Sequence, residues 1–321
     1  MITSLHQLQE ISVPMGQTTH SRALGAIWST CVADALGGPV QFMKPNTFPR
    51  VTGLGYIEKY RKPAGSFSDD GSMTLALAKS FIDSGGTYNQ TLAIQYWTQW
   101  NTRQSLLIWK RHGLDDVEAT QRLVDTKLEK EERSGNGSLM RVSPVGVALF
   151  RDADAARRVA RVQSVPTHPC LACVESCEAF TLLVCKAMNG ETKEQICESP
   201  CNFPFTHPAL ASRFAQYKNM NDFAVRSRSD VQSTGWVVDT LKVALWAFFK
   251  YDSWADCVLA VVNLGGDSDT AGTVCGGLCG VYYGIDSIPE GWRMGMMNLP
   301  LIIGISDGFA DLVSSQPGTG Q

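Results

Sequence analysis

The stretch that decides the fold runs from Asn263 to Gly284 and reads NLGGDSDTAGTVCGGLCGVYYG. Its apolar part carries a glycine at every fourth position: Gly272, Gly276, Gly280 and Gly284. Residues four apart share one face of a helix, so these glycines form a strip that a second backbone can approach closely. The stretch therefore predicts a buried helix packed tightly against another helix.

Acidic residues stand at the entrance of this expected helix. Asp267 and Asp269 lie two apart in a glycine-rich turn, and the hydroxyl of Thr270 follows. Burying carboxylates at the N-terminus of a tightly packed helix costs free energy unless a positive charge lies beside them. We interpret this cluster as half of a metal site. The other half is expected in a matching cluster nearer the N-terminus: Ser68, Asp69 and Asp70.

The N-terminal cluster also has the pattern of a helix start. Ser68 is expected to cap a helix that ends at Gly85-Gly86, with Asp69 and Asp70 in its first turn, where negative charge is favourable. Capping alone would explain one acid. Two adjacent acids and a hydroxyl exceed what a cap requires, which favours ligand chemistry.

The two clusters together offer only oxygen ligands. Such a set suits Mg²⁺, Mn²⁺ or Ca²⁺ and disfavours zinc or an iron–sulfur cluster. Four carboxylates are more than one divalent ion needs, so a pair of ions is expected. Two metals can bind vicinal hydroxyls or phosphate oxygens and activate a water molecule. This pattern alone leaves a phosphatase, a glycosidase and a calcium-binding protein open.

Composition limits the class of protein. The chain has 321 residues, of which 44% are hydrophobic, enough for one large core or two small ones. Charged residues are 18%, below the usual value of about 25%, which favours a compact fold. The net charge of -3 gives no reason to expect nucleic acid as a partner.

The chain shows neither a signal peptide pattern nor an apolar run long enough to span a membrane, so a cytoplasmic protein without a membrane partner is expected. The ten dispersed cysteines then predict reduced thiols. Cys170, Cys173 and Cys177 resemble a ligand cluster at first sight. No second ligand pair has zinc-knuckle spacing, so buried free thiols are the favoured interpretation.

Helical periodicity dominates the chain and strict alternation is scarce, which predicts an all-α fold. We expect a peripheral segment over residues 1–20, one domain over residues 21–313 and a flexible tail over residues 314–321. Residues 44–64 read as a loop, and residues 190–233 as an irregular insert with some helix. Residues 21–42 read as a helix that ends at Gly37-Gly38-Pro39. Further helices are expected from 68 to the glycines at 85–86, and over 91–109, 152–161, 170–188, 235–251 and 253–262.

Three further features bear on function. The turn Gly135 to Ser138 (GNGS) precedes a helix and offers backbone N–H groups to an anion such as a phosphate, although it is also ordinary turn chemistry. His168 stands at a helix entrance, where a structural role is the more common one. Asp34, inside the first helix, is interpreted first as a structural hydrogen-bond acceptor and second as a catalytic group.

Several motifs in order resemble the ADP-ribosylglycohydrolase family. The resemblance spans residues 21 to 284, most of the chain, and begins with GAIWSTCVADALGGPVQF. It implies an all-α orthogonal helical bundle with a binuclear Mg²⁺ or Mn²⁺ centre in a cleft. It also implies hydrolysis of the glycosidic bond between ADP-ribose and a protein or small-molecule acceptor. The other motifs are SDD before a helix, GNGSLMRVSPVG, THP before a helix, TGWVVDTLKVALWAF and NLGGDSDTAG.

The resemblance also implies residue roles. Asp70 or Asp269 would help to deprotonate the water that attacks the distal ribose. His168 would lie near the ADP-ribose, and Tyr283 near the adenine, although a core position is at least as expected for Tyr283. The implied metal ligands are Ser68, Asp69, Asp70, Asp267, Asp269 and Thr270. The implied diphosphate and ribose contacts are Gly135, Asn136, Gly137 and Ser138.

The chain departs from the family pattern at a few positions. Ser68 and Gly71 stand where the family usually has threonine, and serine keeps the ligating hydroxyl. Gln41 stands where several members, including the serine-specific hydrolase, carry glutamate. Glutamine cannot act as a base, so arginine-linked ADP-ribose is favoured over serine-linked.

Two other classes compete with the hydrolase. One is a catalytically silent member that binds ADP-ribose or serves a structural role, as the crystallin relatives do. Retention of five or six ligand positions argues against it. The other is a calcium-binding structural domain, which lacks the loop spacing of a standard calcium motif.

Overall fold

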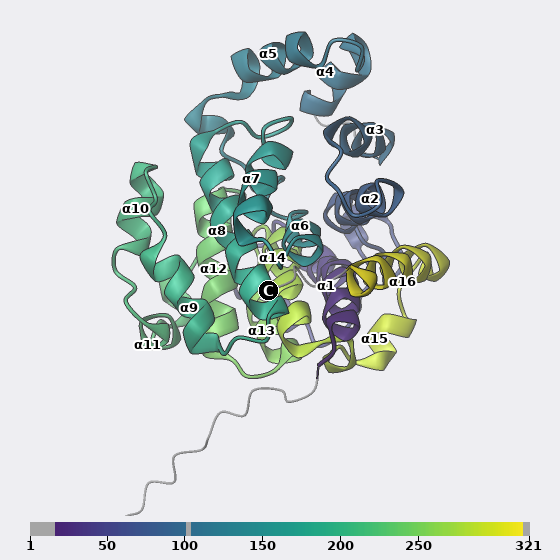
Figure 1. Ribbon diagram of the computed structural model, residues 1–321. Coiled ribbons are helices and arrows are strands. Elements are labelled where there is room, and N and C mark those ends of the chain that lie inside the picture. Colours follow the sequence, from purple (N-terminus) through teal and green to yellow (C-terminus); the bar gives the residue numbers. More distant parts are fainter. Residues whose placement is uncertain (1–16, 101–103, 317–321) are drawn as a thin grey trace, which may run out of the picture.

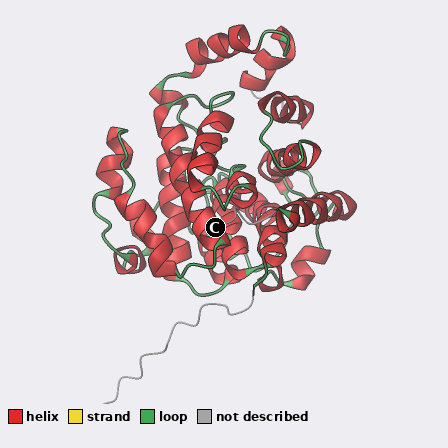
Figure 2. Cartoon of the chain, viewed as in Figure 1, coloured by secondary structure: helices red, strands yellow, loops and turns green. Residues whose placement is uncertain are grey.

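The computed structural model describes residues 17–100 and 104–316, and these ranges contain helices and two isolated bridges but no strand (Figures 1 and 2). The predicted all-α class is confirmed. The α-helices are α1 (Thr19–Gly37), α2 (Asp69–Asp83), α3 (Gln90–Trp100), α4 (Gln104–His112), α5 (Val117–Leu128), α6 (Ser143–Ala148), α7 (Ala153–Ser164), α8 (Leu171–Met188), α9 (Lys193–Asn202), α10 (Pro208–Phe214), α11 (Met220–Ala224), α12 (Val237–Lys250), α13 (Trp254–Val262), α14 (Ser268–Tyr283), α15 (Glu290–Met294) and α16 (Leu299–Ser315). Short 3₁₀ turns are η1 (Gly38–Val40), η2 (Glu58–Tyr60), η3 (Glu131–Arg133), η4 (Arg228–Asp230) and η5 (Ile285–Ser287).

Helices α1 and α14 pack against each other along their length at the centre of the fold. The glycine strip makes this possible. A Cβ atom at Gly280 would lie 2.6 Å from the carbonyl carbon of Gly25, and one at Gly276 would lie 3.0 Å from the carbonyl oxygen of Ser29. The predicted close approach of a second backbone is therefore confirmed, and the partner is α1.

The remaining helices surround this central pair. Helices α2 and α16 pack on α1, whereas α8, α12 and α13 pack on α14. Helix α7 covers α8, and α9 to α11 form an outer flank beside α12 (Figure 1). The apolar side chains of all these layers join one buried cluster. None of the described helices is both long enough and apolar enough to cross a bilayer.

Helix boundaries follow from local chemistry. Thr18 caps α1 by accepting a hydrogen bond from the Ser21 N–H at 3.0 Å, and the helix ends at the predicted Gly37-Gly38-Pro39 sequence. Helix α2 begins at the predicted cap, Ser68, with both acids in its first turn.

Some expectations and the observed elements differ. Helices α15 and α16 lie in the segment after Gly284, where the sequence analysis specified no helix. The expected helix over residues 91–109 is described as two, α3 and α4, and the charged segment after it contains α5. Helix α16 extends to Ser315, two residues into the expected tail, and α1 begins two residues before Ser21. The rest of the expected tail from residue 317, and residues 1–16, lie outside the described residues.

Candidate metal centre and substrate loop

Three carboxylates from three helices meet at one point. Asp34 of α1, Asp70 of α2 and Asp269 of α14 each place an oxygen within 4.8 Å of the others. All three are about 1% exposed. The two predicted clusters are therefore brought together from opposite ends of the chain, with a third acid between them.

Asp34 accepts hydrogen bonds from the start of α2. Its Oδ2 atom lies 2.8 Å from Ser68 N, 2.9 Å from Gly71 N and 3.1 Å from Ser68 Oγ. Ser68 Oγ also lies 2.9 Å from Asp70 Oδ2. Asp34 is thus a structural acceptor, as interpreted from sequence, and a member of the acid cluster as well. The sequence clue to this second role was an acid among small apolar residues.

Asp269 is held from two sides. Its Oδ1 accepts from the Thr270 N–H at 2.9 Å, and its Oδ2 accepts from the side-chain amide of Gln41. Close packing sets this contact, because a Cβ atom at Gly37 would lie only 2.7 Å from the Ser268 carbonyl carbon. Gln41, which stands where several members of the family it resembles carry glutamate, therefore lies at the acid cluster.

Asp267 is delivered by a turn that needs glycine. Gly265 and Gly266 have φ values of +69° and +62°, a region that strains residues with a side chain. The Asp267 N–H donates to the Ser233 carbonyl at 3.1 Å. Its Oδ2 accepts from Asn136 Nδ2 at 2.6 Å, so the predicted substrate loop and the predicted metal cluster are in direct contact.

The acids of the cluster disfavour one another's ionised form. Burial raises the pKa of Asp34 well above its usual range, and the charge of Asp70 raises it further, against the N–H donors of Gly71 and Ser68. Burial also raises the pKa of Asp269, and the charges of Asp34 and Asp267 add to the effect. Protonation of one of the acids, or a bound cation, would remove the electrostatic repulsion among them.

The donor set fits a hard divalent cation. The three clustered groups are carboxylates, and the hydroxyls of Ser68 and Thr270 and the carboxylates of Asp69 and Asp267 stand within one or two residues of them in sequence. Ions such as Mg²⁺ and Mn²⁺ prefer all-oxygen sets of this kind. Among the described residues, the three aspartates form the one group of His, Cys, Asp and Glu side chains close enough to share an ion.

The loop from Gly135 to Ser138 lies beside His168. A Cβ atom at Gly135 would be 3.7 Å from His168 Nε2, and His168 Nδ1 lies 2.9 Å from Thr167 Oγ1. Asn136 is anchored a second time by Thr240 Oγ1 at 3.0 Å, and its N–H donates to the Gly235 carbonyl. Ser138 is fully buried and its Oγ bonds Ser164 Oγ at 2.8 Å, so its side chain faces the core.

Tyr283 is not brought to the acid cluster. It lies at the other end of α14, fourteen residues and about 20 Å of helix beyond Asp269. Its hydroxyl donates to the Tyr251 carbonyl at 3.2 Å within the core. Tyr283 therefore occupies the core position that the sequence analysis considered. Every residue of α14 is buried, so the C-terminal end of the helix also packs inside the core.

Sequence reasoning missed Arg141, which braces the substrate loop from within. Its guanidinium is fully buried and lies over the Trp97 ring at 3.7 Å from the centroid. It donates to Gln163 Oε1 at 3.0 Å and to Thr167 Oγ1 at 2.8 Å. Through Thr167 it reaches the His168 ring. An arginine inside an otherwise apolar motif was the available signal.

Most of the chain matches known proteins. Residues 15–318 match the family model described as ADP-ribosylglycohydrolase. The chain belongs to the ADP-ribosylglycohydrolase family. It is 30% identical to the ADP-ribosyl-[dinitrogen reductase] glycohydrolase of Rhodospirillum rubrum, over 86% of this chain and 90% of that protein. It is 27% identical to the ADP-ribosylarginine hydrolase Tri1 of Pseudomonas putida, over 84% of this chain and 73% of that protein.

A solved structure supports the same assignment. The chain titled "ADP-ribosylglycohydrolase-related protein complex" aligns with a TM-score of 0.73 and 27% identity, over 92% of this chain and 99% of that one. The resemblance drawn from the motifs is confirmed, and the protein is a glycohydrolase enzyme. Members of this family use a metal, which agrees with the buried acids described above.

Proposed function

We propose that this glycohydrolase hydrolyses the bond between ADP-ribose and an arginine side chain of an acceptor, with divalent cations held by the acid cluster. The observation that carries the proposal is the convergence of Asp34, Asp70 and Asp269 within 4.8 Å in a buried setting. Three like charges in such a place require a cation or protons. The relatives named ADP-ribosylarginine hydrolase support the choice of arginine.

The expected ligands are the six side chains predicted from sequence, Ser68, Asp69, Asp70, Asp267, Asp269 and Thr270, with Asp34 added by the structure. When bound, two hard cations would neutralise the acids, grip ribose hydroxyls and acidify water. The side chains of the protein itself hold the substrate-binding segments in position. Asn136 ties the substrate loop to Asp267 at 2.6 Å, so the diphosphate loop and the ribose site move as one unit.

Proton transfer falls to the carboxylates. Asp70 or Asp269 would take the proton of the attacking water, since both lie at the meeting point of the helices. Unliganded carboxylate oxygens there would also stabilise the oxocarbenium-like charge that develops on the ribose. His168 beside Gly135 would contact the ADP-ribose from the other side of the loop.

Gln41 favours arginine over serine as the acceptor. Its amide donates to Asp269 and cannot deliver a carboxylic acid proton. A serine alkoxide is a poor leaving group and needs such a proton. An arginine guanidinium is already protonated, because its pKa exceeds about 12, and it departs as a neutral guanidine. A site without an acid at this position is thus suited to the nitrogen-linked substrate.

The test is hydrolysis of ADP-ribosylarginine by the full-length protein, with Mg²⁺, with Mn²⁺ and with EDTA. We expect activity with either metal and none with EDTA. Asp269→Asn should lower activity by roughly 10²-fold or more. Asp311→Asn is the matched control, because Asp311 lies on the exposed surface of α16 and is 77% exposed. Full activity of Asp269→Asn, or turnover in EDTA, would refute the proposal.

A parallel assay on serine-linked ADP-ribose tests the acceptor. We expect arginine-linked substrate to be cleaved faster by the natural enzyme. Gln41→Glu should raise the ratio of serine-linked to arginine-linked hydrolysis, because it restores a carboxyl group at that place. A natural enzyme that prefers serine-linked substrate would contradict the role assigned to Gln41.

A further inference from the structure

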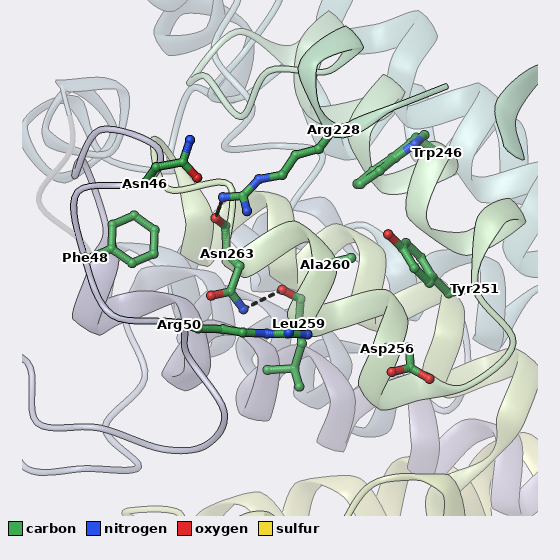
Figure 3. A pocket seen from close by; sticks show the side chains of 10 residues that line it. All are labelled: Asn46, Phe48, Arg50, Arg228, Trp246, Tyr251, Asp256, Leu259, Ala260 and Asn263. Atoms are coloured by element: carbon green, nitrogen blue, oxygen red, sulfur yellow. Dashed lines mark hydrogen bonds between the residues drawn. The ribbon is translucent and has the colours of Figure 1, made fainter. Parts of the chain in front are cut away.

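A second cavity lies away from the acid cluster, between the loop that contains Phe48 and Arg50 and the helices α12 and α13. Figure 3 shows it, with Arg228 of η4 entering from above. Its volume is about 360 Å³, within the range of small-molecule sites, which begins at about 300 Å³. None of its lining residues is among the residues implied for ADP-ribose.

The guanidinium groups of two arginines line this cavity. Arg228 donates to the backbone carbonyl of Asn263, and Arg50 lies across the cavity from it (Figure 3). Within residues 17–100 and 104–316, no carboxylate forms an ion pair with either guanidinium. Burial raises the pKa of Tyr251, and the charges of Cys257 and Asp256 raise it further, while the charges of Arg228 and Arg50 act in the opposite sense.

The acidic member of the lining is already engaged. Asp256 accepts a hydrogen bond from Ser253 Oγ at 2.6 Å in the capping turn of α13. It is therefore held at the start of the helix, at the edge of the cavity (Figure 3). The lining carries two guanidiniums against this one carboxylate, so a net positive charge remains for a ligand, and planar guanidiniums bind phosphate oxygens in pairs.

Aromatic rings form opposite walls. Phe48 stands on one side, and Tyr251 and Trp246 stand on the other (Figure 3). Tyr251 meets Trp246 edge to face at 5.9 Å between centroids, and Trp246 Nε1 donates to the Arg226 carbonyl at 3.0 Å. These contacts hold Tyr251 and Trp246 in place. Aromatic walls beside a pair of cations suit a flat ring that carries a phosphate.

The walls of the cavity are continuous with the chain that positions Asp267. The Asn263 side chain holds the Val51 backbone by bonds of 2.8 and 3.0 Å, and the Gly265-Gly266 turn follows directly. On the other side, η4 leads to Ser233, whose carbonyl accepts from the Asp267 N–H at 3.1 Å. A ligand here would touch both segments that hold Asp267.

We propose that this cavity binds a mononucleotide, with its phosphate between Arg50 and Arg228 and its base between Phe48 and Tyr251. The site is distinct from the one proposed for ADP-ribose.

Binding of AMP to the full chain by calorimetry tests the proposal, and loss of that binding in the arginine variants assigns it to this cavity rather than to the site proposed for ADP-ribose. We expect one AMP per chain, and weaker binding of adenosine or inorganic phosphate, which each supply half of the contacts. Arg50→Gln and Arg228→Gln should each weaken AMP about 10-fold or more. Arg158→Gln is the matched control, because it removes an exposed arginine on α7.

The variants separate this site from the first one. Asp269→Asn should leave AMP affinity unchanged, whatever it does to hydrolysis, so the two proposals can fail independently. Within the described part of the chain, the Arg50 side chain makes no hydrogen bond to a backbone carbonyl, unlike that of Arg228, so Arg50→Gln remains informative if Arg228→Gln unfolds. Unchanged AMP affinity in Arg50→Gln, or no AMP binding at millimolar concentration, would overturn the proposal.

Discussion

The contact between Gly25 and Gly280 gives the sharpest test of the fold. In Gly280→Ala, the new Cβ would lie 2.6 Å from the Gly25 carbonyl carbon and closer still to its oxygen. It would also meet Ser29 Oγ, which already accepts from Trp254 Nε1 at 2.6 Å. Ordinary contacts begin at 3.4 Å, so the backbone of α1 has to move by most of an ångström or more.

The expected magnitude follows from two opposing effects. Overpacking a rigid core costs about 1–3 kcal/mol, and a clash of backbone with backbone belongs at the upper end. Replacing glycine by alanine inside a helix returns about 1 kcal/mol. We therefore expect Gly280→Ala to lower the free energy of unfolding by roughly 2 kcal/mol. The reciprocal change, Gly25→Ala, should act similarly, because its Cβ would lie 2.9 Å from the Gly280 carbonyl carbon.

Urea denaturation followed by circular dichroism at 222 nm measures the effect, with equal slopes required for a fair comparison. Gly304→Ala is the matched control, since Gly304 is exposed within α16 and has nothing within 4 Å of its Cβ position. That variant should gain up to about 1 kcal/mol. If Gly280→Ala proves as stable as Gly304→Ala, the glycine strip does not set the spacing of α1 and α14.

Three further changes probe the site. Arg141→Lys should cost about 2–3 kcal/mol in urea denaturation, because lysine cannot keep the paired bonds to Gln163 and the stacking on Trp97. Gln41→Glu should lower the melting temperature in EDTA by adding a charge beside Asp269, and Mg²⁺ should raise it by more than in the natural protein. The Cys170 thiol should ionise with a midpoint near 6, because the Cys173 hydrogen bond lowers the pKa of Cys170 to about 6, and Cys173→Ala should move the midpoint upward; thiolate absorbance at 240 nm, compared with Cys170→Ala, measures it without access to the buried sulfur, and an unmoved midpoint would contradict this cause.

Local chemistry made much of the site predictable. The cap at Ser68, the acids after it and the glycine period before Gly284 are properties of short stretches, and each folds as its spacing indicates. The ligand types could also be read directly, because a set of oxygen donors excludes soft metals whatever its geometry.

Other features depended on contacts between distant segments. The sequence could not show that Asp34 would join Asp70 and Asp269, since the meeting of three helix ends depends on how α1 packs on α14 and α2. Nor could it show that Arg50 and Arg228, far apart in the chain, would line one cavity.

The division has one physical cause. Helix periodicity, capping and ligand hardness are set within a few residues, so the sequence by itself determined the all-α class, the main helix starts and the kind of ion expected. Which side chains share a buried space depends on the packing of helices far apart in the chain. Only the tertiary structure could decide that Asp34 completes the acid cluster, that Asn136 ties the loop to Asp267 and that Gln41 lies on Asp269.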